Sequence, residues 1–408
     1  MGCCEKRKEE RSIEENKERK ESEMQENITK DQDEEVEKES DKEAEKDINR
    51  DSGIENIKLT YNDFEALKLL GTGSFGRVLL VRFLNNNNLY AMKILSKDQI
   101  KLRHQEEHTK TERDLMVKVN SPFIVNIKCA FQDENKLYIV SDFMQGGDMF
   151  YHLHSNKKFD EKTARFYLIE IILALEFLHK NNMIYRDLKP ENILMDSNGH
   201  LKISDFGLSK ILDNPYDKAY TLCGTPQYLA PEILKNQGYD KTVDWWSLGC
   251  LLYEMVTGIL PFYIPKGNKI NPFIFEEPLQ FPSGLNPTTI SLIKELLTVN
   301  PKKRLGYGKG DANSIKSHEF FKDIDWEKYM KKEIKAPFIP DLEDELDLKY
   351  FDKMFTEEPI DSDRPSINTR TREHSNYKGF TYVTNSVQQD IIKTANLGDI
   401  EEENQNDV

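Results

Sequence analysis

The pattern of apolar residues changes once along the chain, and this change constrains the fold more than any other feature. Short runs rich in apolar and β-branched residues predict a small antiparallel sheet at 67–70, 78–83, 90–94 and 137–140, interrupted by a charged stretch with helical spacing at 99–119. From about Gly146, apolar residues recur at helical spacing, over 164–179, 244–257 and 287–298. This order predicts an α+β fold of two lobes, a small sheet with one helix and a larger, mainly helical lobe, with a cleft between them.

The two ends of the chain lack the composition of a packed domain. Residues 1–58 hold 13 Lys or Arg against 21 Asp or Glu, with few apolar residues. Such a segment buries too little to offset its ordering entropy, so we expect disorder there. After about Phe320 the chain is charged, with prolines and isolated aromatic residues. We therefore place the main domain at 59–320, an extension at 321–382 and a flexible acidic tail at 383–408.

The composition limits the compartment and the class of partner. The net charge of −15 argues against nucleic-acid binding and leaves room for basic protein substrates. The five cysteines have no metal-type spacing, which fits a reducing compartment. No run approaches the length of a bilayer span. We expect a cytoplasmic protein unless a lipid anchors it.

Three glycines form a G-x-G-x-x-G pattern between two strand-like runs: Gly71, Gly73 and Gly76. A dinucleotide-binding enzyme needs a helix directly after these glycines, so the following strand excludes that class. A glycine hairpin lets backbone N–H groups approach phosphates, although an ordinary hairpin turn is the alternative. Downstream, Lys93 lies among apolar residues and needs a partner, which Glu112 could supply. That pair is either a plain salt bridge or a lysine held against phosphates.

Polar motifs follow the long apolar helix. Asp187 and Asn192 lie in Y-R-D-L-K-P-E-N, Asp205 begins D-F-G, and A-P-E follows at 230–232. At this spacing one carboxylate can accept the proton of a substrate hydroxyl, while a second carboxylate and an amide hold Mg²⁺ between phosphates. Each motif alone is weak, because a lone aspartate near an arginine is usually a surface ion pair. Their order and spacing together indicate phosphoryl transfer.

With these motifs, residues from about 64 to 382 resemble an AGC-type serine/threonine protein kinase, the group that contains protein kinases A, G and C and Akt. Tyr185, where most kinases have histidine, is usual in that group. The resemblance implies the two-lobed protein-kinase fold, protein substrates, and ATP and Mg²⁺ as cofactors. It implies that Asp187 is the catalytic base, that Lys189 contacts the γ-phosphate, that Lys93 pairs with Glu112 and the phosphates, and that Asn192 and Asp205 bind Mg²⁺. It also implies ATP contacts from Leu70, Gly71, Thr72, Gly73, Ser74, Phe75, Gly76, Val78, Ala91, Lys93, Asp142, Met144 and Leu194.

The activation loop of this group is similar to the segment around Thr221. The resemblance makes Thr221 a phosphate acceptor for an upstream kinase, with His108, Arg186 and Lys210 as cationic partners. An exposed loop threonine without this role is the alternative. Thr225 is expected to contact the catalytic loop.

The tail sequence Y-K-G-F-T-Y resembles the hydrophobic motif of the group. Tyr377 and Phe380 would dock into an apolar groove, and a phosphate on Thr381 would lie near Lys97. A flexible end with incidental aromatic residues is the alternative. Upstream, Ser362 resembles a turn-motif phosphosite, with Glu358 where a threonine is often found.

Three acidic residues match positions that recognise an arginine before the phosphosite in this group. The resemblance therefore implies a preference for R-x-x-S/T sites. Ordinary solvated charge is the alternative, above all for Glu254. The residues are Asp148, Glu191 and Glu254, with an apolar pocket after the phosphoacceptor from Leu222, Pro226 and Leu229.

Two further departures from the group have consequences. Ser141 resembles the gatekeeper, where a larger residue is common, so a pocket behind the adenine is expected. Pro265 and Pro272 interrupt the region 261–278, which predicts a short or irregular helix there.

The N-terminus offers lipid attachment sites. Gly2 is a candidate for myristoylation, and Cys3 and Cys4 are candidates for palmitoylation. Two acyl chains would hold the chain stably at the inner face of a membrane. Lys6 departs from the usual Ser or Thr of the myristoylation motif, and an unmodified segment is the alternative.

The sequence thus predicts a monomeric, arginine-directed serine/threonine kinase that phosphorylation activates. The alternative is a catalytically silent, membrane-tethered scaffold with the same fold. A silent version normally lacks Lys93, Asp187 or Asp205, and all three are present.

Overall fold

The computed structural model describes residues 58–73, 76–103, 105–214, 217–262, 275, 277–360 and 377–394. Within these ranges no helix is long and apolar enough to cross a bilayer. Predictions on several residues fall outside the described ranges: Gly2, Cys3, Cys4, Ser74, Phe75, Pro265, Pro272 and Ser362.

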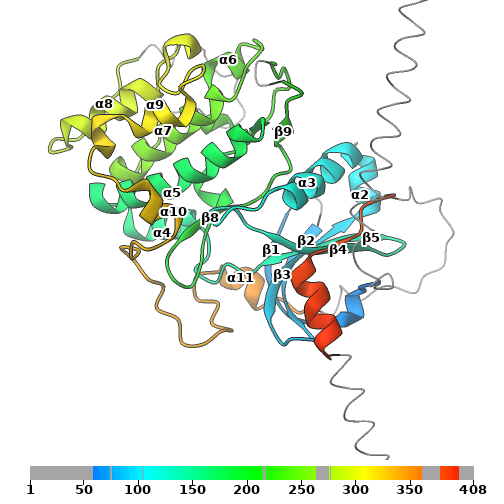
Figure 1. The fold of residues 1–408 in the computed structure, drawn as a ribbon. Helices are drawn as coiled ribbons and strands as arrows, with labels where there is room; N and C mark the ends of the chain where they lie inside the picture. The colour runs from blue at the N-terminus through cyan, green and yellow to red at the C-terminus, as the bar shows by residue number, and fades with distance from the viewer. Residues whose placement is uncertain are drawn as a thin grey trace, which may run out of the picture. The chain divides into compact units, whose positions relative to one another are not determined.

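The small lobe is a six-stranded antiparallel sheet in the order β1-β2-β3-β5-β4-β10. Its strands are β1 (Phe64–Thr72), β2 (Gly76–Phe83), β3 (Leu89–Ser96), β4 (Ile127–Gln132), β5 (Lys136–Asp142) and β10 (Tyr382–Val383). The four runs predicted from sequence lie in β1, β2, β3 and β5. After β3 come the capped helix α2 (Lys97–Leu102) and then α3 (Glu106–Lys118), which lies beside the sheet (Figure 1).

The large lobe is mainly helical, which confirms the predicted α+β class. Its helices are α4 (Met149–Asn156), α5 (Glu161–Lys180), α6 (Pro231–Leu234), α7 (Thr242–Thr257), α8 (Pro287–Leu296) and α9 (Asp311–Lys316). Two short two-stranded sheets pair β6 (Met183–Ile184) with β9 (Lys210–Ile211), and β7 (Ile193–Met195) with β8 (Leu201–Ile203). Among the described residues, the short 3-10 helices include η1 (Tyr61–Asp63), η2 (Pro190–Asn192), η3 (Pro226–Tyr228), η5 (Pro301–Lys303) and η6 (Glu319–Phe321).

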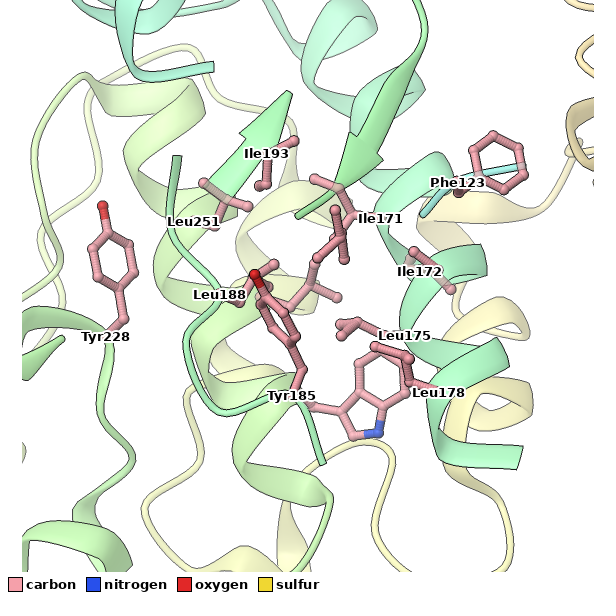
Figure 2. Close-up of a cluster of buried hydrophobic side chains, with 14 of the residues drawn as sticks. Phe123, Ile171, Ile172, Leu175, Leu178, Tyr185, Leu188, Ile193, Tyr228 and Leu251 are labelled. Carbon is pink, nitrogen blue, oxygen red and sulfur yellow. The ribbon is translucent and has the colours of Figure 1, made fainter. Parts of the chain in front are cut away.

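The core of the large lobe holds the loop that carries the catalytic motifs. α5 and α7 are buried on almost every face, as expected for helices that are apolar all round. In Figure 2, Ile171 and Leu175 of α5 lie beside Tyr185 and Leu188 of that loop, and all four are buried. The loop is therefore anchored by packing on both sides of Asp187.

The tail returns to the small lobe after α10 (Trp326–Met330) and α11 (Lys353–Thr356). α11 contacts β1, and β10 pairs with β4. The sequence analysis assigned 383–408 to a flexible tail, but residues 385–394 are helical in the structure. Only Val387, Ile391 and Ile392 are apolar in this helix, and contacts with distant residues hold it, as described below.

Candidate active site

Lys93 on β3 and Glu112 on α3 form the predicted ion pair. The Lys93 Nζ lies 2.6 Å from Glu112 Oε1 and 3.7 Å from Asp205 Oδ1. Burial opposes the charged form, but the two carboxylates outweigh it and raise the pKa of Lys93. The lysine charge in turn lowers the pKa of Asp205. The site therefore presents a fully charged ammonium beside an ionised carboxylate.

The glycine pattern forms the predicted hairpin between β1 and β2, with Gly71 opposite Val78. The Gly73 N–H donates to the Gly76 carbonyl oxygen at 2.8 Å. A Cβ on Gly76 would lie 1.7 Å from the carbonyl oxygen of Ile94, so only glycine lets β2 approach β3 at this point. A strand and not a helix follows the glycines, as predicted.

Asp187 lies at the centre of a hydrogen-bond network. Lys189 Nζ lies 2.8 Å from Asp187 Oδ2, and Asn192 Nδ2 donates to the same oxygen at 2.9 Å. Thr225 donates its backbone N–H and its hydroxyl to Asp187 Oδ1 at 3.0 and 2.8 Å. Thr225 thus contacts the catalytic loop, as predicted, and the carboxylate is oriented by donors on both oxygens.

The two predicted Mg²⁺ ligands are brought together by the hairpin of β7 and β8. Asn192 precedes β7, and its carbonyl oxygen accepts the backbone N–H of Ser204 at 2.9 Å, next to Asp205. Asp205 has a φ of 53°, a strained conformation that sites often hold for function. Among the described residues no group of three His, Cys, Asp or Glu forms a metal site. An amide and a carboxylate nevertheless fit Mg²⁺, which takes few protein ligands when phosphates supply the rest.

Two residues that the sequence analysis missed hold the catalytic loop. Asp244 on α7, which is fully buried, accepts the backbone N–H groups of Tyr185 and Arg186 at 2.9 and 2.8 Å. The ring of His179 bridges Asp244 at 2.8 Å and Asp311 at 3.0 Å. Burial opposes protonation, but the two carboxylates raise the pKa of His179 to about 9. The sequence did offer one indication of this role: Asp244 lies within an otherwise apolar helix, and a buried carboxylate needs partners.

A cavity of about 950 Å³ is lined by residues of both lobes and of the tail. Phe351 of the tail lines it, and its ring lies 5.8 Å from that of Phe143, in the segment after β5. Among the described residues of the glycine hairpin, Thr72, Gly73 and Gly76 are not part of the lining. The predicted ATP-binding residues that line the cavity are Leu70, Gly71, Val78, Ala91, Lys93, Asp142, Met144 and Leu194, and Ser141 joins them.

Asp142 has a second role that the sequence did not indicate. Its carboxylate lies 2.8 Å from Lys128 Nζ on β4 and 2.6 Å from Lys202 Nζ on β8. Burial opposes ionisation, but the two lysines lower the pKa of Asp142. The side chain therefore links the lobes beside the cavity.

Two protein families match this chain, at positions that agree with this geometry. Residues 64–321 match the protein kinase domain, and residues 342–382 match the protein kinase C terminal domain. The chain belongs to the protein kinase family. The predicted AGC-type resemblance and the two-lobed fold are therefore confirmed.

Curated relatives of this kinase agree with the assignment. It is 46% identical over 331 residues to the RAC family serine/threonine-protein kinase homolog of Dictyostelium discoideum, covering 81% of this chain and 74% of that protein. It is 48% identical over 309 residues to the serine/threonine-protein kinase gad8 of Schizosaccharomyces pombe, covering 76% and 54%. It is 44% identical over 332 residues to ribosomal protein S6 kinase 2 alpha of Gallus gallus, covering 81% and 44%. The chain is thus a serine/threonine protein kinase of the AGC type.

In the activation segment of the kinase, the Thr221 backbone and Arg186 share the hydroxyl of Tyr239 as a hydrogen-bond partner. The Tyr239 hydroxyl donates to the Thr221 carbonyl oxygen at 2.8 Å and accepts from Arg186 Nη1 at 3.1 Å. Arg186 has a φ of 73°. No hydrogen bond between described residues joins His108 or Lys210 to Thr221; His108 lies on α3 and Lys210 on β9. Of the three predicted cations, Arg186 is thus connected through Tyr239 to the backbone of Thr221.

The acidic residues predicted to read arginine lie within electrostatic reach of one another. Asp148 caps α4 by accepting the Tyr151 N–H at 2.8 Å, and Asp148 and Glu191 both line the cavity. Glu254 accepts from the Tyr228 hydroxyl at 2.5 Å. Burial, together with the charge of Glu191, raises the pKa of both Asp148 and Glu254. A cation placed between these groups would relieve their repulsion.

The three apolar residues predicted to form the adjoining pocket differ in exposure. Leu222 is 64% exposed, whereas Leu229 is 6% exposed and packs in the core. Pro226 begins η3 between them. Of the two leucines, only Leu222 is free to contact a bound peptide.

The predicted hydrophobic motif is docked on the small lobe. Tyr377 and Phe380 are 1% and 2% exposed. The Tyr377 carbonyl oxygen accepts from Gln132 Nε2 at 2.8 Å, and the Phe380 carbonyl oxygen accepts from Arg113 Nε at 2.9 Å. Arg113 on α3 is the neighbour of Glu112, so the motif contacts the helix that positions Lys93.

Proposed function

We propose that this kinase transfers the γ-phosphate of Mg-ATP to serine and threonine hydroxyls in R-x-x-S/T sequences. The observation that carries this preference is the pair Asp148 and Glu191 in the lining of the cavity, with Glu254 within electrostatic reach of Glu191. Carboxylates bind the guanidinium fork in bidentate geometry. Burial and the nearby charge of Glu191 raise the pKa of both Asp148 and Glu254, and a bound cation would favour their ionised forms. The acidic chain also favours the approach of basic peptides.

The residues divide the chemistry among them. Asp187 accepts the proton of the attacking hydroxyl while Lys189 supplies positive charge to the phosphoryl group. Lys93, held by Glu112, binds the phosphates that are not transferred. Mg²⁺, when bound, neutralises charge on the phosphate oxygens, and Asn192 and Asp205 would hold it.

Regulation is proposed at two threonines. A phosphate that an upstream kinase adds to Thr221 would meet Arg186, the neighbour of Asp187, with His108 and Lys210 completing the site. The link through Tyr239 supports this arrangement. Thr381, exposed beside the docked aromatic pair, is the second site, and Ser362 is a third candidate.

Acylation at Gly2, Cys3 and Cys4 is proposed to hold the otherwise cytoplasmic, monomeric kinase at the inner face of a membrane. We expect Gly2→Ala to shift the protein into the soluble fraction of fractionated cells. An unchanged distribution would refute this part of the proposal.

The test of the function is phosphate transfer by the full-length protein from Mg-ATP to serine peptides. Peptides with Arg three residues before the serine should be phosphorylated faster than matched peptides with Ala there, and more so after Thr221 phosphorylation. Asp187→Asn should abolish transfer. No transfer by folded, ATP-binding, Thr221-phosphorylated protein would favour the silent scaffold, and equal transfer to both peptides would refute the arginine preference.

A further inference from the structure

The chain beyond the hydrophobic motif is built onto the small lobe. Tyr382 and Val383 pair with Ala130 and Cys129 of β4, and the Thr384 N–H donates to the Lys128 carbonyl oxygen at 2.9 Å. Residues 385–394 then form a helix, drawn in red in Figure 1 after the short strand beside β4. We call residues 384–394 the C-terminal clamp. Strand pairing therefore passes directly from the motif into the clamp.

Contacts at the start, middle and end hold the clamp. Gln388 Nε2 donates back to the Val383 carbonyl oxygen at 3.2 Å, and Val387 is 3% exposed. At the far end, Asn86 Nδ2 donates to Asp390 Oδ2 at 2.9 Å, and the Thr394 hydroxyl donates to the Asn85 carbonyl oxygen at 3.0 Å. Asn85 and Asn86 lie in the turn between β2 and β3, so the helix spans from the sheet edge to that turn.

Lys97, which was predicted to lie near a phosphate on Thr381, already has uncharged hydrogen-bond partners. Lys97 is 5% exposed, and its Nζ lies 2.9 Å from Gln132 Oε1 and 2.7 Å from the Asp133 carbonyl oxygen. The same ammonium lies 5.6 Å from the centre of the Tyr377 ring. The contacts that dock the motif are thus made by Tyr377 and Phe380 with Gln132, Arg113 and Lys97.

We infer that the C-terminal clamp keeps the hydrophobic motif docked against α3 in the absence of phosphate on Thr381. Val387 and Asp390 are then positioning residues, because Phe380 holds Arg113, and Arg113 adjoins the Glu112 that orients Lys93. This inference rests on the proposed regulation through the motif. If it holds, phosphate on Thr381 strengthens the docking of the motif but is not required for it.

The test breaks the clamp helix while keeping the side chains that contact the small lobe. Gln389 is an exposed residue within the helix, so Gln389→Pro removes a backbone donor and disrupts the helix, whereas Gln389→Ala preserves it. Both variants are made in the full-length protein and treated with phosphatase. Hydrogen exchange at Tyr382 and Val383 is measured, together with binding of a fluorescent peptide of residues 374–384 added in trans.

We expect Gln389→Pro to speed exchange at β10 by at least about tenfold and to bind the peptide, because an opened groove accepts it. Wild type and Gln389→Ala should keep slow exchange at β10 and should not bind the peptide. Val387→Ser, which removes the apolar anchor and leaves the helix intact, should give an intermediate result. Slow exchange and no peptide binding in Gln389→Pro would overturn the inference.

A second readout separates this inference from the proposed function. In active protein, Gln389→Pro should lower kcat relative to Gln389→Ala, with a smaller loss after Thr381 is phosphorylated. The exchange and peptide measurements, repeated in Asp187→Asn protein, require no phosphate transfer. If the proposed function is wrong, the exchange and peptide results are therefore unaffected. If the clamp inference is wrong, the two Gln389 variants give the same exchange and peptide results.

Discussion

Thr225 links the catalytic base to the adjacent lysine. Its hydroxyl donates to Asp187 Oδ1 at 2.8 Å and accepts from Lys189 Nζ at 2.9 Å, while its N–H also donates to Asp187. The backbone N–H is kept in Thr225→Ala and Thr225→Ser, so the hydroxyl alone can be tested. A single atom on the activation segment thus sets the relative orientation of two catalytic groups.

We expect Thr225→Ala to lower kcat about 10- to 100-fold, because a hydrogen bond to a charged group contributes about 1.5–3 kcal/mol. The KM for ATP should change little, since Thr225 is not among the residues that line the nucleotide cavity. Thr225→Ser keeps the hydroxyl and should retain most of the activity. Steady-state kinetics with Mg-ATP measures both, and an equal loss in the two variants would exclude a role for the hydroxyl.

Ser141 leaves space that a larger gatekeeper would occupy. It lines the cavity together with Val125 and Ile139. ATP analogues with a bulky aromatic group should therefore inhibit the wild type well, and Ser141→Met should weaken that inhibition while ATP still binds. Ser141→Ala is the matched control and should stay sensitive. The measurement is inhibition by the analogue in competition with ATP. Unchanged inhibition in Ser141→Met would show that the analogue does not occupy the space beside Ser141.

His179 makes stability depend on pH in a defined window. Its pKa is raised from 6.5 to about 9, so the stabilisation by the imidazolium is complete below pH 6.5 and is lost as the pH rises through 9. A shift of this size corresponds to about 3 kcal/mol. The thermal unfolding midpoint of the wild type should fall across this window, and the fall should be absent in His179→Gln. Parallel pH profiles of the two proteins would contradict this account.

At the scale of elements, the sequence predicted what local pattern determines and missed what distant contacts determine. The strands β1, β2, β3 and β5 carry runs of apolar residues, and each was predicted. β10 holds two residues and exists because β4 offers a free edge; the clamp helix depends on Asn85 and Asn86, far away in sequence. In the same way, Asp187 and Asp205 were predicted because each lies in a short motif. Asp244 and His179, which hold the catalytic loop, lie in no such motif and were not predicted.

The tail crosses the nucleotide cavity before it reaches the clamp. Phe351 and Phe355 line the cavity, and Glu358 Oε1 lies 2.8 Å from Arg77 Nη2 on β2, next to Gly76. Glu358 stands where a threonine is often found, so its carboxylate is a permanent charge that requires no phosphorylation. The ion pair connects the strand after the glycine hairpin to the tail that covers the cavity.

We expect Glu358→Gln to raise the KM for ATP by about two- to fivefold, because an exposed ion pair contributes about 0.2–1 kcal/mol. The kcat should change less, since Asp187 and Lys189 are not touched. The exchanged pair Arg77→Glu with Glu358→Arg restores opposite charges and should bring the KM back toward the wild-type value. If the exchanged pair binds ATP no better than Glu358→Gln, the charges do not act through each other.

At the scale of the whole catalytic domain, the lobes meet in a charge cluster as well as in the chain that connects them. Lys128 belongs to the small-lobe sheet and Lys202 to the large lobe, and both contact the carboxylate of Asp142. The three side chains are 14–27% exposed, so solvent screens them only in part. The cluster holds the position of the lobes beside the nucleotide cavity.

A double-mutant cycle tests whether the two lysines act as one clamp. Lys128→Met or Lys202→Met alone leaves Asp142 with one partner, so each should lower the unfolding free energy by about 1 kcal/mol. The double variant leaves a partly buried carboxylate without a cation, so its loss should exceed the sum of the single losses by about 0.5–3 kcal/mol. The KM for ATP should rise most in the double variant, because the lobes then lose their fixed separation. Additive losses in chemical denaturation would mean that each lysine stabilises only its own lobe, and the cluster would not join the two.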